Sequence, residues 1–416
     1  MTSKIMGGLS VTFAGLLLAG CAASVADAPA ATIATAPEQV EPAMAAPTSA
    51  ALPADRNVLF WSQEMRAMAF RAMDQMPQLA ASRVIAAGAN TRALPMGEPL
   101  DLGAFDLDAF MDAQSTAAIV VVQDGEIVLE RYGLGFSADQ KWTSFSVAKS
   151  LTSTLVGAAI ADGYINSVDD PVTQYITDLA GSAYDDVTIQ QLLTMSSGVG
   201  WSEDYSDPNS DVAQFNDYVA EDGMDPTVSY LRNLPRASEP GTDWNYSTGE
   251  TNLVGVLVSE ATGKTLSDYL SEKVWSPFGM AQDATWLLGN TGHEIAGCCI
   301  QATTRDMARF GLFTLGDGMA DGERVVPEGW LEEATSPIFQ LDGSGRGYGY
   351  QWWTYPGEIY AANGIFGQGI FIDPTRNLVI ATNANWAQPT GEGGSSGRLF
   401  GFYRAVIGAV EARGSD

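Results

Sequence analysis

The sequence is poor in several side chains on which many enzymes depend. Its 416 residues include one histidine, His293, and three cysteines at positions 21, 298 and 299. These residues form no spaced Cys/His set that could ligate zinc, so we predict no metal site. A Ser-His-Asp triad would have to use His293, and no G-x-S-x-G elbow in a strand-turn-helix setting accompanies it. We therefore interpret His293 as a loop residue.

Basic residues are scarce as well. The chain has 21 Lys+Arg against 50 Asp+Glu, which gives a formal net charge of −29. This excess of acid opposes binding to nucleic acid and electrostatic docking on anionic lipid. The sequence also lacks a nucleotide-binding glycine fingerprint after a strand, and we predict no organic cofactor.

The neighbouring residues Cys298 and Cys299 raise the question of a disulfide. A bond between adjacent cysteines closes a strained eight-membered ring. The sequence therefore favours two small, buried, reduced thiols in a Gly-rich turn.

The first twenty residues differ from the rest of the chain. Lys4 precedes an apolar run over residues 5–18, which is too short to span a bilayer comfortably and is typical of a signal peptide. The run ends in Leu18-Ala19-Gly20-Cys21, which resembles the lipobox of bacterial lipoproteins. The alternative is an ordinary signal peptide cleaved among the small residues 22–24. Because residue 22 is Ala and not Asp, the resemblance implies a lipid anchor at Cys21 on the periplasmic side, at the outer membrane.

Composition divides the remainder into two parts. Residues 21–55 are rich in Ala, Pro and Thr and have few large apolar side chains, so we predict a flexible tether. Residues 56–416 are long enough for one large catalytic domain.

Strand patterns lie near both ends of this domain and helical patterns lie in its middle. Strands are expected at 118–123 and 126–132, joined by Asp124-Gly125, and at 348–354, 358–362, 368–372 and 378–382. Helices are expected at 61–76, 146–162, 188–194, 250–262, 303–315 and 397–411. The predicted fold class is α/β of the α+β type, in which an antiparallel sheet is flanked by helices and carries an inserted, mostly helical subdomain.

The motif with the most chemical content is Ser146-Val147-Ala148-Lys149, the only S-x-x-K in the chain. Residues three apart lie on one helical face, so the Lys149 ammonium can reach the Ser146 hydroxyl. The positive end of the helix dipole favours alkoxide character at Ser146. An apolar pocket would lower the pKa of Lys149 and let it act as a base near pH 7. Taken alone, the motif is more typical of an N-capping serine and a surface lysine.

Three segments carry a resemblance to a known family. Residues 142–153, with the sequence WTSFSVAKSLTS, resemble the nucleophile segment of the serine β-lactamase and penicillin-binding protein superfamily. Residues 187–198 and 302–311 also match this family, in the branch of 6-aminohexanoate-dimer hydrolases and related esterases. The resemblance covers about residues 110–410. It implies a β-lactamase/transpeptidase-like fold, Ser146 as nucleophile and Lys149 as its base.

The other two motifs of the family are recognisable but altered. Tyr246-Ser247-Thr248 resembles Y-x-N, which implies a catalytic Tyr246, with Thr248 where the motif has Asn. The segment 362–364, Ala-Asn-Gly, stands where relatives have K-T-G or H-T-G, and no cation is present at Ala362. By family geometry, the amides of Ser146 and Ile365 would form the oxyanion hole. Thr248, Gly364 and Tyr205 are candidate substrate-binding residues.

The sequence therefore predicts a serine acyl hydrolase that cleaves a small amide or ester through an acyl-enzyme. Because Ala362 supplies no cation, β-lactams are disfavoured as substrates. Two alternatives stay open: a D-alanyl peptidase or β-lactamase acting on cell-wall-type molecules, and a non-catalytic envelope binding protein. The expected partners are the small-molecule substrate and a membrane reached through Cys21, with no nucleic acid.

Overall fold

The computed structural model describes residues 52–53, 55, 57–76, 81–220, 223–290 and 292–414. The described residues all belong to one compact unit, Pro42–Asp416. The predicted signal peptide, Cys21 and nearly all of the tether lie outside the described residues. Over the described ranges, no helix has the length and apolar character needed to cross a membrane.

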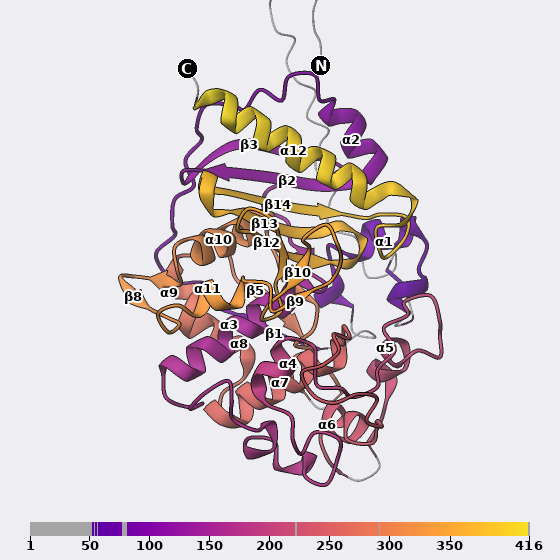
Figure 1. Ribbon diagram of the computed structural model, residues 1–416. Helices are drawn as coiled ribbons and strands as arrows, with labels where there is room; N and C mark the ends of the chain where they lie inside the picture. The colour runs from indigo at the N-terminus through magenta and orange to yellow at the C-terminus, as the bar shows by residue number, and fades with distance from the viewer. Residues whose placement is uncertain are drawn as a thin grey trace, which may run out of the picture. The chain divides into compact units, whose positions relative to one another are not determined.

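An eight-stranded antiparallel sheet joins the two ends of the domain (Figure 1). Val121 lies opposite Ile380, so residues 259 positions apart in sequence are direct neighbours in the sheet. This confirms the prediction of one antiparallel sheet made from distant parts of the chain. The strands, in spatial order, are β3 (Glu126–Tyr132), β2 (Thr116–Gln123), β14 (Leu378–Ala384), β13 (Gln368–Asp373), β12 (Ile359–Gly364), β11 (Trp353–Tyr355), β10 (Gly347–Tyr348) and β9 (Phe339–Gln340).

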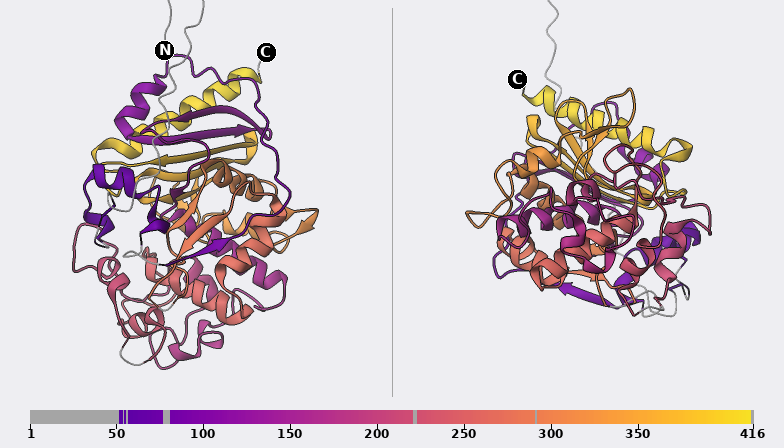
Figure 2. Two further views of the ribbon diagram at one scale, coloured as in Figure 1. Left: turned by 180° about the vertical axis from the view of Figure 1, so that it is seen from behind. Right: turned by 60° about the horizontal axis from the view of Figure 1, so that its bottom comes forward.

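Alternating side chains of this sheet pack against two different helical layers. Ile119 and Val121 belong to the same core cluster as Phe402 of the C-terminal helix α12 (Ser395–Arg413). Val120 and Val122 instead join the core that contains the helices of the middle of the chain. Because successive side chains point to opposite faces and both faces are covered, residues 117–122 of β2 are all apolar. Figure 2 shows the yellow C-terminal helix on one face of the sheet and the magenta and salmon helices gathered on the other.

The predicted helices are present with shifts of one or two residues at most ends, except that 61–76 breaks into α1 and a 3-10 turn at Met73–Gln75. The helices other than α12 are α1 (Gln63–Ala69), α2 (Leu107–Gln114), α3 (Val147–Ala161), α4 (Ile189–Leu193), α5 (Asp211–Gln214), α6 (Pro226–Leu231), α7 (Thr248–Thr262), α8 (Leu266–Leu270), α9 (Ser276–Phe278), α10 (Thr304–Leu315) and α11 (Trp330–Ala334).

One prediction about a strand was wrong. The segment 348–354 is not one strand, because Gln351 has a φ of 60° and turns the chain between β10 and β11. The middle of the chain also contributes to a second antiparallel sheet that the sequence patterns did not reveal. Its strands, in spatial order, are β1 (Ser82–Ile85), β5 (Ala284–Leu287), β6 (Ile300–Ala302) and β4 (Trp142–Thr143); β7 (Met319–Ala320) and β8 (Glu323–Arg324) form a separate hairpin.

Candidate active site

A sharp turn between β4 and α3 presents Ser146 at the start of the helix. Ser146 is the N-cap residue of α3, but its side chain makes no capping hydrogen bond, so its oxygen is not committed to the helix backbone. The preceding residue, Phe145, has a φ of 42°, which is uncommon for a residue with a side chain. Its ring packs against Phe70 and Phe366 at centroid distances of 4.9 and 5.6 Å, and this packing holds the turn.

Lys149 is buried one turn later and points at three oxygen atoms. Its Nζ lies 3.4 Å from Ser146 Oγ, 3.0 Å from Thr248 Oγ1 and 2.8 Å from the carbonyl oxygen of Gly297. Burial lowers the pKa of Lys149 from 10.5 to about 8, although the negative charge of Glu203 acts in the opposite direction. Lys149 is therefore a side chain that can exchange a proton near neutral pH.

Tyr246 lies beside the same ammonium group, on the loop that leads into α7. Its ring centroid is 5.3 Å from Lys149 Nζ, and the ring stacks on Trp353 of β11. Burial and the charge of Glu203 raise the pKa of Tyr246, while a hydrogen bond with Ser146 opposes that rise. The phenol therefore keeps its proton over the working range of most enzymes and is available as a donor.

Glu203 is a site residue that the sequence reasoning missed. Its Oε1 accepts hydrogen bonds from the hydroxyls of Tyr205 and Thr248, and its Oε2 accepts from the indole of Trp201 and the amide of Thr248. In a chain with 50 acidic residues, nothing in its sequence context separates Glu203 from a solvated surface carboxylate. Only the contact across 45 residues, to Thr248, reveals it.

The end of β12 passes directly beside the amide of Ser146. A Cβ atom added to Gly364 would lie 3.1 Å from Ser146 N and 2.7 Å from the carbonyl oxygen of Ser144. Gly364 thus permits an approach that any other residue would obstruct. Ile365 follows Gly364 in the chain, while Ala362 is buried in the strand.

A cavity of about 430 Å³ opens onto Ser146. Of the predicted residues, Ser146, Tyr205, Tyr246, Gly364 and Ile365 line it, whereas Lys149 and Thr248 do not. The lining also includes six aromatic and aliphatic side chains, those of Trp353, Tyr355, Trp386, Leu399, Phe400 and Tyr403. Arg346 also lines the cavity and pairs with Asp342 at 3.0 Å.

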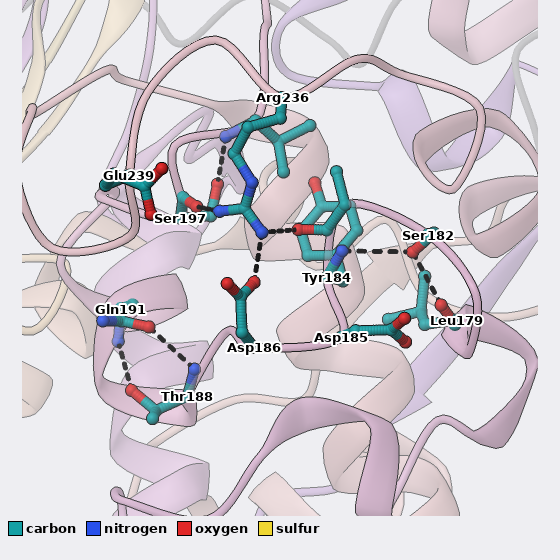
Figure 3. Close-up of polar contacts among 12 residues, drawn as sticks. Leu179, Ser182, Tyr184, Asp185, Asp186, Thr188, Gln191, Ser197, Arg236 and Glu239 are labelled. Carbon is teal, nitrogen blue, oxygen red and sulfur yellow. Dashed lines mark hydrogen bonds and ion pairs between the residues drawn. The ribbon is translucent and has the colours of Figure 1, made fainter.

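Arg236 ties together the segments around residues 183–186 and 197 (Figure 3). Its guanidinium donates to the carbonyl oxygens of Ser197 at 3.0 Å and Ala183 at 2.6 Å and pairs with Asp186. Ser197 in turn donates its hydroxyl to Glu250, a buried residue of α7. Burial raises the pKa of Glu250 to about 8. These contacts fix the start of α7, which carries Thr248.

The prediction of reduced thiols at 298 and 299 was wrong. Cys298 and Cys299 form a disulfide with each other. They follow Gly297, whose carbonyl oxygen accepts a hydrogen bond from Lys149. Cys299 adopts a φ of 74°, so the backbone supplies the turn that this ring requires. His293 lies in the loop between β5 and β6, as expected. Within the described ranges, no group of three His, Cys, Asp or Glu side chains could hold a metal ion.

Comparison with known proteins agrees with the class that the fold indicates, which is a serine hydrolase. The β-lactamase family model matches residues 106–399. The chain belongs to this β-lactamase family of serine hydrolases. The 6-aminohexanoate-dimer hydrolase of Paenarthrobacter ureafaciens is 33% identical over 301 residues, which cover 68% of this chain and 76% of the relative.

Two solved structures share the fold. A Bacillus anthracis protein named as a 6-aminohexanoate-dimer hydrolase superposes with a TM-score of 0.73 at 23% identity, covering 84% of this chain and 95% of its own. A family VIII carboxylesterase superposes with a TM-score of 0.56 at 19% identity, covering 74% of this chain and 99% of its own. Hydrolases of this fold act on amide or ester bonds.

Proposed function

We propose that this protein cleaves an amide or ester bond through an acyl-enzyme on Ser146. The observation that carries the proposal is the buried Lys149, whose Nζ lies 3.4 Å from Ser146 Oγ. A lysine with a pKa of about 8 is partly neutral near pH 7 and can remove the proton of a hydroxyl. A lysine that served only as a structural cation would not need to be shielded from water.

The proposed reaction assigns one role to each neighbouring group. Lys149 takes the proton of Ser146 as Oγ attacks the carbonyl carbon, and the amides of Ser146 and Ile365 stabilise the oxyanion. Tyr246 passes a proton to the leaving amine or alcohol, and the bond to the leaving group breaks. Water then attacks the ester on Ser146, the acid is released and the hydroxyl is restored.

The cavity supports a substrate with an apolar portion. Six aromatic and aliphatic side chains line it, and we propose an amide or ester of the kind suggested by the 6-aminohexanoate-dimer hydrolase and carboxylesterase relatives. One observation favours a second candidate, a peptidase or β-lactamase. Arg346 lines the cavity and could meet a substrate carboxylate in place of the cation missing at Ala362. Turnover of a chromogenic cephalosporin distinguishes the two candidates.

We also propose that the protein is exported and anchored by lipid at Cys21. The support is the order of Lys4, the apolar run and the lipobox-like residues 18–21. Metabolic labelling with a palmitate analogue should mark the wild-type chain and not Cys21→Ser. Equal labelling of both chains would refute the anchor.

The experiment that tests the proposed function is rapid-mixing hydrolysis of a p-nitrophenyl ester. The wild-type protein should release about one equivalent of nitrophenolate in a burst, because acylation precedes slower deacylation. Ser146→Ala should lose the burst, while the exposed control Ser206→Ala should keep it. Equal, burst-free rates in all three proteins would refute the assignment of Ser146 and favour a binding protein.

A further inference from the structure

Four hydrogen-bond donors converge on the carboxylate of Glu203 at the edge of the catalytic site. The Tyr205 hydroxyl lies 2.7 Å from Oε1 and the Thr248 amide lies 3.0 Å from Oε2, with the Thr248 hydroxyl and the Trp201 indole completing the set. An ionised carboxylate has about four lone-pair positions, so these donors occupy its full capacity. Glu203 therefore has no position left for a substrate, although its side chain borders the cavity.

This arrangement fixes the direction of the hydrogen bond made by Thr248. A hydroxyl has one proton to donate, and the proton of Thr248 is given to Glu203. Thr248 Oγ1 can then only accept a hydrogen bond from Lys149 Nζ, 3.0 Å away. The carbonyl oxygen of Gly297, 2.8 Å from Nζ on another side, is also an acceptor only. The position of Gly297 is fixed by its backbone N–H, which donates to Asn252 Oδ1 of α7 at 2.9 Å.

These two acceptors determine where the lone pair of a neutral Lys149 points. A neutral amine has two protons and one lone pair, and its protons are taken by Thr248 and Gly297. The remaining tetrahedral direction leads to the third neighbour, Ser146 Oγ. We propose that Glu203 is a positioning residue that fixes the polarity of the Thr248 hydroxyl and so aims the lone pair of Lys149 at Ser146. This inference rests on the proposed acyl-enzyme chemistry and deepens it.

Other ionisable groups around Lys149 do not supply this orientation. Tyr246 presents its ring to Nζ, at 5.3 Å from the centroid, and the hydroxyl of Tyr205 is directed at Glu203. Glu250 of α7 is turned away toward Ser197 and Tyr184. The charge that acts on Lys149 is that of Glu203, and it stabilises the ammonium form of the lysine.

The substitution Glu203→Gln reverses the hydrogen-bond chain. The indole of Trp201 and the amide of Thr248 require an oxygen at one position, so the new amide nitrogen faces the Thr248 hydroxyl and donates to it. Thr248 then gives its proton to the Lys149 lone pair and diverts it from Ser146. We expect the acylation rate constant to fall about 10- to 100-fold with KM changed less than about threefold.

The pH profile separates this role from simple structural damage. Loss of the carboxylate charge removes a group that stabilises the ammonium, so the midpoint of the acidic limb should move to lower pH while the plateau falls. General loss of folded protein would lower the plateau and leave the midpoint in place. Asp204→Asn, which removes a charge at the adjacent exposed residue, is the matched control and should behave as wild type.

Variants of Thr248 test the same chain without altering the carboxylate. Thr248→Val removes the hydroxyl and should lower the acylation rate constant by a comparable factor. Thr248→Ser keeps a hydroxyl, so its rate constant should lie within about threefold of wild type. Because Glu203 acts through Thr248, the double variant should be no slower than Thr248→Val alone. If Glu203→Gln does not fold, the Val and Ser pair decides the question.

Two results would overturn the inference. One is a Glu203→Gln acylation rate within twofold of wild type with an unmoved midpoint, and the other is full activity in Thr248→Val. Either result would leave the wild-type burst and its loss in Ser146→Ala intact. Absence of the burst from wild type would instead overturn the proposed function itself.

Discussion

Burial of Lys149 sets the pH at which the proposed base can work. With its ordinary pKa of 10.5, only about 0.03% of the side chain would be neutral at pH 7, whereas a pKa of about 8 makes about 10% neutral. The buried position therefore increases the population of the base about 300-fold at this pH. The acylation rate should rise about tenfold per pH unit below pH 8 and level off above it.

The assay is the acylation rate constant for a p-nitrophenyl ester, measured by rapid mixing between pH 5.5 and 9.5. Lys149→Arg keeps the positive charge but cannot lose its proton in this range, and it should reduce acylation at least about 1000-fold. Glu250 also has a pKa raised to about 8, so Glu250→Gln is the required control and should keep the midpoint of wild type. A profile that is flat from pH 6 to 9, or a midpoint that moves with Glu250→Gln, would refute the assignment of Lys149 as the base.

Three further predictions concern the groups around this pair. Tyr246→Phe should slow cleavage of an anilide at least about 100-fold but a p-nitrophenyl ester less than about tenfold, because nitrophenolate leaves without a proton; equal losses would contradict a proton-donor role. Glu250 has a folded-state pKa raised from 4.5 to about 8, so its contribution to stability is complete below about pH 4.5 and is lost as pH rises to about 8, by roughly 1.4 kcal/mol per unit. Urea unfolding of Glu250→Gln should lack this pH dependence, and parallel curves for the two proteins would contradict it. Arg236→Met leaves the carbonyl oxygens of two residues without donors and should cost about 1–3 kcal/mol in urea unfolding, while an unchanged midpoint would show that these contacts are dispensable.

The strands of the large sheet could be predicted from local spacing, whereas Ser146 and Lys149 could be assigned as a catalytic pair only with the family resemblance of residues 142–153. Alternation of side chains and the Asp124-Gly125 turn define β2 and β3, and the three-residue interval places Ser146 and Lys149 on one face of α3. The sequence also predicted that strands from the two ends of the domain share one sheet, and the structure shows that β2 and β14 make this junction.

The remaining features depend on contacts between distant segments, which a single sequence does not encode in its periodicity. The second sheet consists of strands of two to four residues, too short to show a period of two. Glu203 acquires its importance only from Thr248, which lies 45 residues away. The disulfide at 298 and 299 occurs together with a positive φ at Cys299, a conformation that no local sequence pattern indicates.

The measurement that tests the central claim most directly is the mass of the protein during turnover. The reaction of the wild-type chain with a slowly deacylating ester is quenched with acid, and the intact mass is compared with that of Ser146→Ala. The proposed mechanism predicts one added acyl group per chain, located by digestion on the peptide that contains Ser146 and absent from the variant. No adduct, or an adduct that persists in Ser146→Ala, would contradict it.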